Sequence, residues 1–397
     1  WTDAIMEDFA WLSLKPDALY IQSEHLPRHQ ELLHQLISTD KAYVSNEPSR
    51  DDSARMVDVV RLRNPGVAIT FNDLIRGNVT FDTTELGDFV IARSIDDPLY
   101  HFAVVVDDGE AGVTHVLRAE EHISNTPRQI LIQEALGIPR PQYGHFPLIL
   151  APDHSKLSKR KHGASIENYR NQGFLPEAIL NYLALLGWNP GTEQELFSVD
   201  ELIRTFDLSR IHKSGAVFDI QKLRWFNREY LKRYSDDEFK SYISDVLSES
   251  LQQRDIFSDD TIISRLVPMI RERIETLDDL KRMILDGEFD FFFKSPTLDS
   301  ATIPGKGSDA STARRHLAAL HEMLAQTPSE EFASVDSIKN VVWNYANEHG
   351  RSSVLWPLRY ALTGRERSPD PFTVISLLGK DASLTRIAAA LSALENV

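Results

Sequence analysis

The short basic run at residues 156–160, with the sequence KLSKR, carries the strongest chemical signal in the chain. Its lysines and arginine flank Ser158, and charge-assisted hydrogen bonds from such cations to phosphate oxygens are strong. Short runs rich in lysine and serine also occur in solvated loops, so the string alone leaves a phosphate role open. No Walker loop, G-x-G-x-x-G or G-x-S-x-G pattern accompanies it. A phosphate contact by this run would therefore be of another kind, and Ser158 is not predicted to be a nucleophile.

A second group of residues that could bind a substrate precedes this run: Tyr100, Arg118, Glu120, Glu121 and His122. Arg118 is expected to end a strand, where its planar guanidinium suits two hydrogen bonds to one carboxylate. An ion pair with a neighbouring glutamate is the simpler interpretation, and position alone favours it somewhat. The glutamates could bind ribose hydroxyls or simply favour the start of the next helix. Asp107 and Asp108 could hold Mg²⁺ or merely form an acidic turn at the end of a strand.

The C-terminal stretch LWPLRYALTGRERSPDPF interleaves aromatic and basic residues, among them Trp356, Arg359 and Arg365. Aromatic rings can stack on unpaired bases, and arginines can contact phosphates or base edges, as recognition of single-stranded RNA loops requires. An amphipathic helix with aromatic core contacts and a basic surface would give the same pattern. The residues alone leave both interpretations open.

The elements expected at the start of the chain are helices followed by short strands. Residues 1–37 contain two amphipathic helical patterns, and the second places Leu32, Leu33, Leu36 and Ile37 on one face. Polar, turn-rich residues 40–56 precede strand-like segments at 57–62, 79–81 and 89–92.

Residues 100–150 are predicted to form a β-α-β unit. YHFAVVV and HFPLIL are expected as buried strands with VTHVL between them, and a helix is expected from Thr126-Pro127 to Gly137. This alternation predicts a parallel α/β sheet that binds ligands at the carboxyl ends of its strands. Beyond the basic run the sequence predicts helices, including PEAILNYLALLG between Pro176 and Gly187. The predicted fold class is therefore α/β followed by all-α.

The composition limits the classes of function. Of the 397 residues, 42% are hydrophobic and 26% are charged, which is typical of a globular chain with about two to four domains. No apolar run is long enough to cross a bilayer, so no membrane partner is expected. The absence of cysteine excludes disulfides, thiolate nucleophiles and Cys-ligated zinc. The net charge of −16 argues against indiscriminate binding to nucleic acid but not against one specific RNA.

Taken in order, these segments resemble the bacterial-type glutamyl-tRNA synthetases, which are class I enzymes. YHFAVVVDDGEAGVTHVLRAEEHISNTPRQILIQEALG is similar to the second half of their nucleotide-binding domain, and KLSKR is similar to their mobile KMSKS signature, with Leu157 in the Met position. GFLPEAILNYLALLGW and FDIQKLRWFNREYL resemble the stem-contact region. WPLRYALTG with SLLGK resembles the end of the helical anticodon-binding part. The resemblance covers nearly the whole chain.

The resemblance implies a role for each matching residue. Lys159 would bind the ATP phosphates and stabilise the charge that develops as pyrophosphate leaves, and the rest of the basic run would shape that loop. The expected site residues are, for catalysis, Lys156, Ser158, Lys159 and Arg160; for glutamate, Tyr100 and Arg118; for ATP, Lys159, Glu121 and Ile149; and for tRNA, Trp356, Arg359 and Arg365.

The resemblance also implies the reaction and its participants. ATP with Mg²⁺ would activate L-glutamate to glutamyl-adenylate, and the acyl group would then pass to the 3′ end of tRNA(Glu) without a protein nucleophile. No zinc is expected. The protein is expected to act as a cytoplasmic monomer in protein synthesis, and whether it also charges tRNA for glutamine stays open.

The implied fold is a partial class I Rossmann-type nucleotide-binding domain with an inserted acceptor-binding region, followed by helical stem-contact and anticodon-binding domains. The expected ranges are a residual catalytic-domain helix at 1–24, an acceptor-stem-binding insertion at 25–99, the second half of the Rossmann-type catalytic domain at 100–150, the KMSKS-like loop and stem-contact domain at 151–234, and a helical anticodon-binding domain at 235–397.

The sequence departs from the family pattern at its start, where the HIGH signature and the strand with an amino-acid-binding arginine are absent. We therefore expect a chain truncated before the HIGH motif and inactive or nearly so by itself. Equal ATP–pyrophosphate exchange by this chain and an N-terminally completed one would refute that expectation. The alternatives are a non-catalytic tRNA-binding remnant and a glutaminyl-tRNA synthetase. The helical pattern at 235–397 disfavours the latter, whose C-terminal part is a β-barrel.

Overall fold

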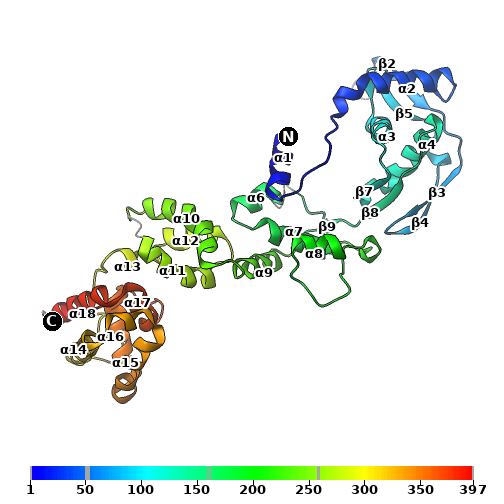
Figure 1. Cartoon of the computed structure of the whole chain (residues 1–397). Helices are drawn as coiled ribbons and strands as arrows, with labels where there is room; N and C mark the ends of the chain where they lie inside the picture. Colours follow the sequence, from blue (N-terminus) through cyan, green and yellow to red (C-terminus); the bar gives the residue numbers. More distant parts are fainter. Residues whose placement is uncertain (1, 50–53, 159–160, 162, 257–259, 396–397) are drawn as a thin grey trace. The chain divides into compact units, whose positions relative to one another are not determined.

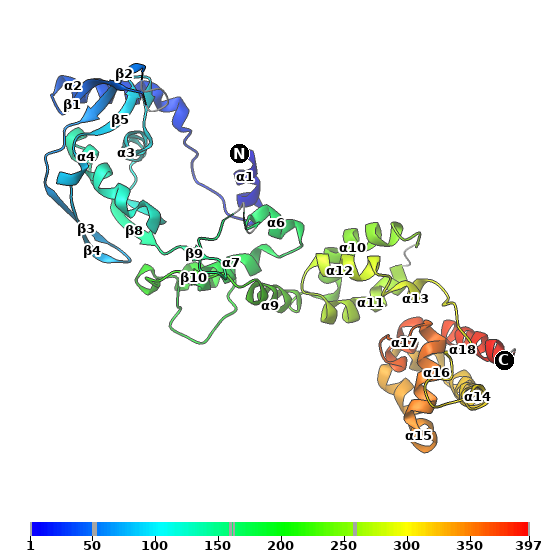
Figure 2. The ribbon, with the colours of Figure 1, turned by 180° about the vertical axis from the view of Figure 1, so that it is seen from behind.

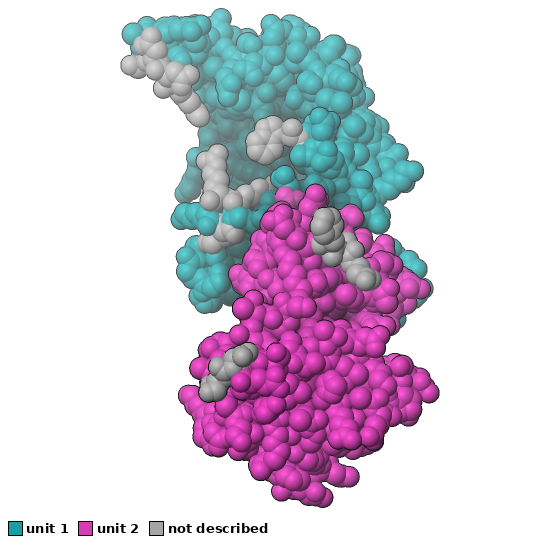
Figure 3. Space-filling model, turned by 90° about the vertical axis from the view of Figure 1, so that its left-hand side faces the viewer, with its two compact units in different colours: residues 1–170, 175–226 teal, residues 171–174, 227–397 magenta. Residues whose placement is uncertain are grey.

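The computed structural model describes residues 2–49, 54–158, 161, 163–256 and 260–395. The chain divides into two compact units, coloured separately in Figure 3. Unit 1 comprises Trp1–Arg170 and Leu175–Phe226, and unit 2 comprises Asn171–Phe174 and Asn227–Val397. None of the helices in the described part of the chain is both long and apolar enough to cross a membrane.

Unit 1 begins with the two predicted helices and an antiparallel sheet. Helices α1 (Thr2–Trp11) and α2 (Leu26–Ser38) confirm the helical patterns, and α2 buries Leu32, Leu33 and Leu36. The sheet has the order β1-β2-β5-β6, with β1 at Ala42–Pro48, β2 at Met56–Leu62, β5 at Phe89–Ser94 and β6 at Asp97–Pro98. The segments predicted at 57–62 and 89–92 are therefore strands. The polar strand β1 was not predicted, because an edge strand needs little apolar surface.

A second sheet with the order β4-β3-β8-β7 carries the candidate site. Its strands are β3 (Ala68–Asp73), β4 (Gly77–Asp82), β7 (His115–Ala119) and β8 (Gln142–Phe146). Strands β7 and β8 pair in parallel, as predicted, and are connected through the 3-10 helix η3 (Glu120–Asn125) and helix α4 (Thr126–Leu136). Strand β3 pairs with β8 in parallel and with β4 as a hairpin. One sheet thus combines strands from the ranges 25–99 and 100–150.

One hydrophobic core joins the two four-stranded sheets of unit 1. It includes Leu33 of α2, Ile91 of β5, Phe71 of β3 and Tyr143 of β8, together with residues of the helices around them. Figures 1 and 2 show α2, α3 (Tyr100–Glu110) and α4 next to these strands. The site strands β7 and β8 are therefore supported by helices whose inner faces are apolar.

The segment YHFAVVV is helical, which corrects its prediction as a strand. It forms most of α3, and the buried residues Phe102, Ala103, Val105 and Val106 recur at the three- and four-residue spacing of a helix face. The run of valines favours a strand by propensity, but packing overrides that preference. Asp107 therefore lies in the last turns of a helix and not at the end of a strand.

The segment HFPLIL is not one buried strand, which is a second correction. Strand β8 ends at Phe146, and β9 (Ile149–Leu150) pairs in parallel with β10 (Ala216–Val217) in a separate small sheet. Pro147 lies between them and has no backbone N–H to continue a ladder. Ile149 is 37% exposed. The predicted helix α4 is confirmed, with Gly137 in the left-handed conformation just after its end.

Helices follow in the rest of unit 1. They are α6 (Ile166–Asn171), α7 (Pro176–Gly187), α8 (Val199–Thr205), the 3-10 helix η4 (Leu208–Arg210) and α9 (Ile220–Leu231), which continues into unit 2. Helix α7 confirms the prediction between Pro176 and Gly187. Its N-terminal proline fits the first helical turn, where a missing N–H costs nothing.

Unit 2 is helical in all its described elements, as predicted. They are α10 (Asp236–Gln252), α11 (Asp260–Arg273), α12 (Leu277–Leu285), α13 (Asp290–Phe293), α14 (Ala310–Gln326), α15 (Val335–His349), α16 (Arg351–Thr363), α17 (Pro371–Leu378) and α18 (Lys380–Glu395). A capping box between Ser235 and Glu238 begins α10. Helices α14 to α18 pack together as a bundle. The chain as a whole therefore combines Rossmann-like parallel pairing with a helical C-terminal part.

Candidate active site at the ends of strands β7 and β8

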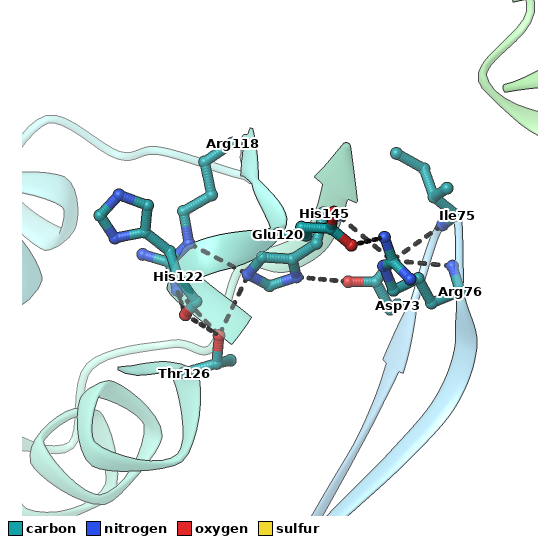
Figure 4. A network of polar contacts seen from close by, with 8 residues as sticks. All are labelled: Asp73, Ile75, Arg76, Arg118, Glu120, His122, Thr126 and His145. Carbon is teal, nitrogen blue, oxygen red and sulfur yellow. Dashed lines mark hydrogen bonds and ion pairs between the residues drawn. The ribbon is translucent and has the colours of Figure 1, made fainter. Parts of the chain in front are cut away.

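Arg118 is the central residue of the site. It lies near the carboxyl end of β7, directly opposite His145 of β8 in the strand register. Its Nε donates a hydrogen bond to Nε2 of His145 at 3.1 Å, and its Nη2 donates to Oγ1 of Thr126 at 2.8 Å. Figure 4 shows the row of side chains from Arg118 through His145 to Asp73. The parallel strand pair thus places a cation where the sequence predicts a ligand crevice.

No carboxylate among the described residues forms an ion pair with Arg118. The two neighbouring glutamates are engaged elsewhere: Glu120 pairs with Arg76, and Glu121 pairs with Lys156. The simpler interpretation, an ion pair between Arg118 and a neighbouring glutamate, is therefore wrong. Burial lowers the pKa of Arg118, whereas Tyr143, Tyr100 and Asp108 act in the opposite direction. A half-buried guanidinium without a carboxylate partner is suited to binding an anionic ligand.

Asp73 and His145 lie behind Arg118 and are both buried. Oδ2 of Asp73 lies 2.5 Å from Nδ1 of His145, and Oδ1 of Asp73 accepts hydrogen bonds from the backbone N–H groups of Ile75 and Arg76 in the β3–β4 turn. Burial acts to raise the pKa of Asp73, but these hydrogen bonds outweigh it and lower the pKa. Burial lowers the pKa of His145, with Asp73 acting against it. The pair is therefore an aspartate and a neutral histidine.

Tyr100 is the first residue of α3 and is 52% exposed. Its ring lies 6.1 Å from that of His122, measured between centroids. Its phenol contributes to the electrostatic environment of Arg118. The two residues expected to bind glutamate are thus close enough to interact.

The start of the basic loop is attached to strand β9. The backbone N–H of Leu157 donates to the carbonyl of Ile149 at 3.0 Å, and Lys156 donates to Glu121. The Lys156 ammonium lowers the pKa of the Glu121 carboxyl. The structure therefore brings together Lys156 and Glu121, two residues that sequence reasoning assigned to the same nucleotide site.

The remaining residues of the loop are only partly described. Oγ of Ser158 accepts a hydrogen bond from the backbone N–H of Lys161 at 3.3 Å. Lys159 and Arg160 lie outside the described residues, and their roles stay predictions.

One member of the acidic pair at the end of α3 contacts a buried histidine. Oδ1 of Asp107 lies 2.7 Å from Nε2 of the buried His29, and burial raises the pKa of Asp108. Within the described ranges, no group of three or more histidine, aspartate or glutamate side chains could hold a metal ion. Neither aspartate is therefore assigned to Mg²⁺.

The three residues expected to bind tRNA lie in unit 2 and also have structural contacts. Trp356 of α16 donates from Nε1 to the carbonyl of Thr302 at 3.2 Å, and the guanidinium carbon of Arg359 lies 5.0 Å from the centre of the Trp356 ring. Arg365 donates to the carbonyl of Gly287 at 2.6 Å and lines a surface pocket with Arg367. The aromatic residue thus packs as the simpler interpretation expected, while the arginines remain near an open surface.

Sequence reasoning missed Asp73, Arg76 and Thr126, and noted His145 only as part of an apolar segment. A usable signal was present for His145, because a polar side chain inside an apolar segment needs a buried partner. Nothing in the sequence identifies Asp73 as that partner, since the two residues meet only through the pairing of β3 with β8.

Comparison with known proteins agrees with this geometry. Residues 49–225 match the family model described as "tRNA synthetases class I (E and Q), catalytic domain", and residues 226–391 match "Anticodon binding domain". The fold and the site therefore define a class I aminoacyl-tRNA synthetase.

Curated relatives narrow the class to one family. A glutamate–tRNA ligase of Caldanaerobacter subterraneus subsp. tengcongensis is 37% identical over 85% of this chain and 69% of its own length. One from Desulforamulus reducens is 36% identical over 96% of this chain and 77% of its own length. The crystal structure of a glutamate tRNA ligase from Elizabethkingia meningosepticum in complex with its amino acid matches with a TM-score of 0.81 and 26% identity, covering 98% of this chain and 89% of that one. The chain belongs to the glutamate–tRNA ligases.

Proposed function

We propose that the protein binds L-glutamate at the ends of β7 and β8, with the Arg118 guanidinium holding a carboxylate of the substrate and Tyr100 beside it. The observation that carries this proposal is the half-buried cation without a carboxylate partner among the described residues. Family membership supports the reaction, which is ATP-dependent formation of glutamyl-adenylate and transfer of the glutamyl group to tRNA(Glu).

The two steps need no nucleophile from the protein. A carboxylate oxygen of glutamate attacks the α-phosphorus of ATP and pyrophosphate leaves with the electron pair of the broken P–O bond. A terminal ribose hydroxyl of tRNA then attacks the acyl carbon, and AMP leaves. Catalysis of this kind depends on positioning and on stabilising negative charge.

The nucleotide is proposed to lie beside Glu121, Ile149 and Lys156, with Lys159 on its phosphates. The ion pair between Lys156 and Glu121 supports this placement because it holds the start of the basic loop next to the site. Mg²⁺ enters the proposal only as the counter-ion of ATP, and no residue of the chain is assigned to it. A cytoplasmic location is part of the proposal, since aminoacylation supplies translation.

The tRNA is proposed to contact unit 2 near Arg359 and Arg365. The pocket lined by Arg365 and Arg367 supports this placement, because arginines at an open surface can reach phosphates and base edges.

Glutamate-dependent ATP–pyrophosphate exchange in the presence of tRNA, measured on the full-length protein, tests the proposed role of Arg118. Arg118→Gln removes the charge and is expected to raise the KM for glutamate roughly a hundredfold, while the KM for ATP stays near that of the wild type. Arg140→Gln is the matched control, because Arg140 is exposed and precedes the opposite end of β8. An unchanged KM for glutamate in Arg118→Gln would contradict the proposal.

A further inference from the structure

We propose that Asp73 and His145 form a positioning pair that fixes the guanidinium of Arg118 for the substrate carboxylate. This inference rests on the proposed function of Arg118. It adds two residues that touch no substrate and act through the arginine. They belong to strands β3 and β8, which meet in one sheet, so the β3–β4 hairpin takes part in building the site.

The hydrogen bonds around His145 fix the positions of its protons. An aspartate can only accept hydrogen bonds, so the 2.5 Å contact between its Oδ2 and Nδ1 of His145 requires the proton on Nδ1. Nε2 of the neutral ring then carries a lone pair and accepts from Nε of Arg118 at 3.1 Å. A protonated ring, or the other tautomer, would place an N–H group against the N–H of Arg118. The aspartate therefore selects the histidine tautomer that the arginine needs.

The carboxylate of Asp73 is itself held in place by the backbone. Its Oδ1 accepts from the backbone N–H groups of Ile75 and Arg76 and also from that of His145 at 3.2 Å. Asp73 is only 1% exposed. The carboxylate is thus held by three backbone N–H groups, two in the β3–β4 turn and one on β8, and it cannot move without disturbing the turn and the strand.

Neighbouring side chains form further hydrogen bonds and an ion pair around Asp73 and His145. Arg76, which follows Asp73 in the turn, forms an ion pair with Glu120, and Oε1 of Glu120 accepts from the backbone N–H of Leu148 at 3.0 Å. Thr126, at the start of α4, accepts from Nη2 of Arg118 and lies 3.2 Å from Nε2 of His145. The edge of the guanidinium that carries Nε and Nη2 is therefore oriented, while Nη1 stays outside the contacts with His145 and Thr126.

A merely structural pair would need only the bond between Asp73 and His145, whereas a positioning pair also needs the acceptor at Nε2. Two substitutions separate these roles. In His145→Asn the short amide can still donate to Asp73 but has no atom that reaches Arg118. In His145→Gln the longer amide can present its oxygen near the position of Nε2 but loses the Nδ1 donor. The two variants therefore exchange one contact for the other.

The test measures the KM for glutamate, the KM for ATP and kcat by ATP–pyrophosphate exchange with tRNA present, together with the melting temperature of each full-length variant. His145→Asn is expected to raise the KM for glutamate on the order of tenfold, with less than a twofold change in the KM for ATP. His145→Gln is expected to keep the KM for glutamate within about threefold of the wild type, even where its melting temperature falls further than that of His145→Asn.

The inference is overturned if the two variants share the same KM for glutamate, or if both KM values and kcat change in proportion to the loss of melting temperature. This failure differs from failure of the proposed function. If Arg118→Gln raises the KM for glutamate and His145→Asn does not, only the positioning role is lost. If Arg118→Gln leaves the KM for glutamate unchanged, the binding role of the arginine is lost and the positioning role with it.

Asp73→Asn gives an independent check. The asparagine oxygen can still accept from the turn, but its amide N–H then faces Nδ1 of His145 and forces the proton onto Nε2, against the N–H of Arg118. The KM for glutamate is expected to rise at least as much as in His145→Asn. A normal KM for glutamate in a folded Asp73→Asn protein would overturn the tautomer argument.

Discussion

Arg118 in unit 1 and Arg386 in unit 2 are both arginines without an ion-paired carboxylate in the described parts of the chain, but their surroundings differ. Arg118 is half-buried and donates to the side chains of His145 and Thr126. Arg386 of α18 is only 7% exposed and donates to the backbone carbonyls of Leu362 at 2.7 Å and Lys294 at 3.3 Å. Burial lowers the pKa of Arg386 to about 10.

The difference separates a ligand-binding cation from a structural one. The backbone carbonyls that accept from Arg386 lie at the ends of helices α16 and α13 and complement its charge, so this arginine has a structural role within unit 2. Side chains orient Arg118 from one side and leave it partly open to solvent. A cation without a carboxylate partner therefore indicates a binding site only where it remains accessible and where its neighbours orient it without neutralising it.

Replacement of Arg386 is expected to have the largest effect on stability. Arg386→Met leaves one buried and one part-buried carbonyl without the arginine donor and is expected to reduce the free energy of unfolding of unit 2 by about 3 kcal/mol. Urea unfolding followed by tryptophan fluorescence measures this loss, because Trp343 and Trp356 lie in unit 2. The control is Arg314→Met, since Arg314 forms an exposed ion pair with Glu395. Equal losses of unfolding free energy in Arg386→Met and Arg314→Met would contradict a special structural role for the buried Arg386.

Replacement of Arg118 is expected to have a smaller effect on stability. His145 and Thr126, the buried partners that Arg118→Met would leave, lie 3.2 Å apart and can still hydrogen-bond to each other, so the free energy of unfolding is expected to change by less than about 1 kcal/mol. The same urea titration, read through the circular dichroism of the whole chain, checks this value. A loss as large as that of Arg386→Met would mean that Arg118 is mainly a structural residue.

The smallest effect is expected for an arginine that does have a carboxylate partner. Arg61 of β2 donates to Glu47 of β1 and lowers the pKa of Glu47 to about 2, from an ordinary value of 4.5. Because the pKa is lowered in the folded state, the stabilisation is present above pH 4.5 and is lost as the pH falls toward 2. The melting temperatures of the wild type and Glu47→Gln are expected to differ slightly at pH 6 and to converge over that range. A difference that grows on acidification would contradict the assignment.

The sequence predicted the elements whose signals are local. The helix from Thr126 to Gly137 followed from a proline at its start and a glycine after its end, and the parallel pairing of β7 and β8 followed from the alternation around it. The position of Arg118 at the end of β7 was predicted for the same reason. Resemblance over several ordered segments supplied the family, which the comparisons confirm.

The errors have a common physical origin in contacts between distant residues. The valines of YHFAVVV favour a strand by themselves, and packing of α3 against α4, α2 and β5 makes that segment helical. The Asp73–His145 contact joins residues 72 positions apart, and no periodicity in either segment indicates it. The assigned domain ranges and the roles of the individual site residues stay predictions.

A crystal structure of the protein with bound L-glutamate would show whether Arg118 holds the substrate. We expect a carboxylate of the amino acid within hydrogen-bonding distance of the Arg118 guanidinium, while Nε of that arginine still donates to His145. A glutamate bound elsewhere, or an Arg118 side chain turned away from both the ligand and His145, would contradict this expectation.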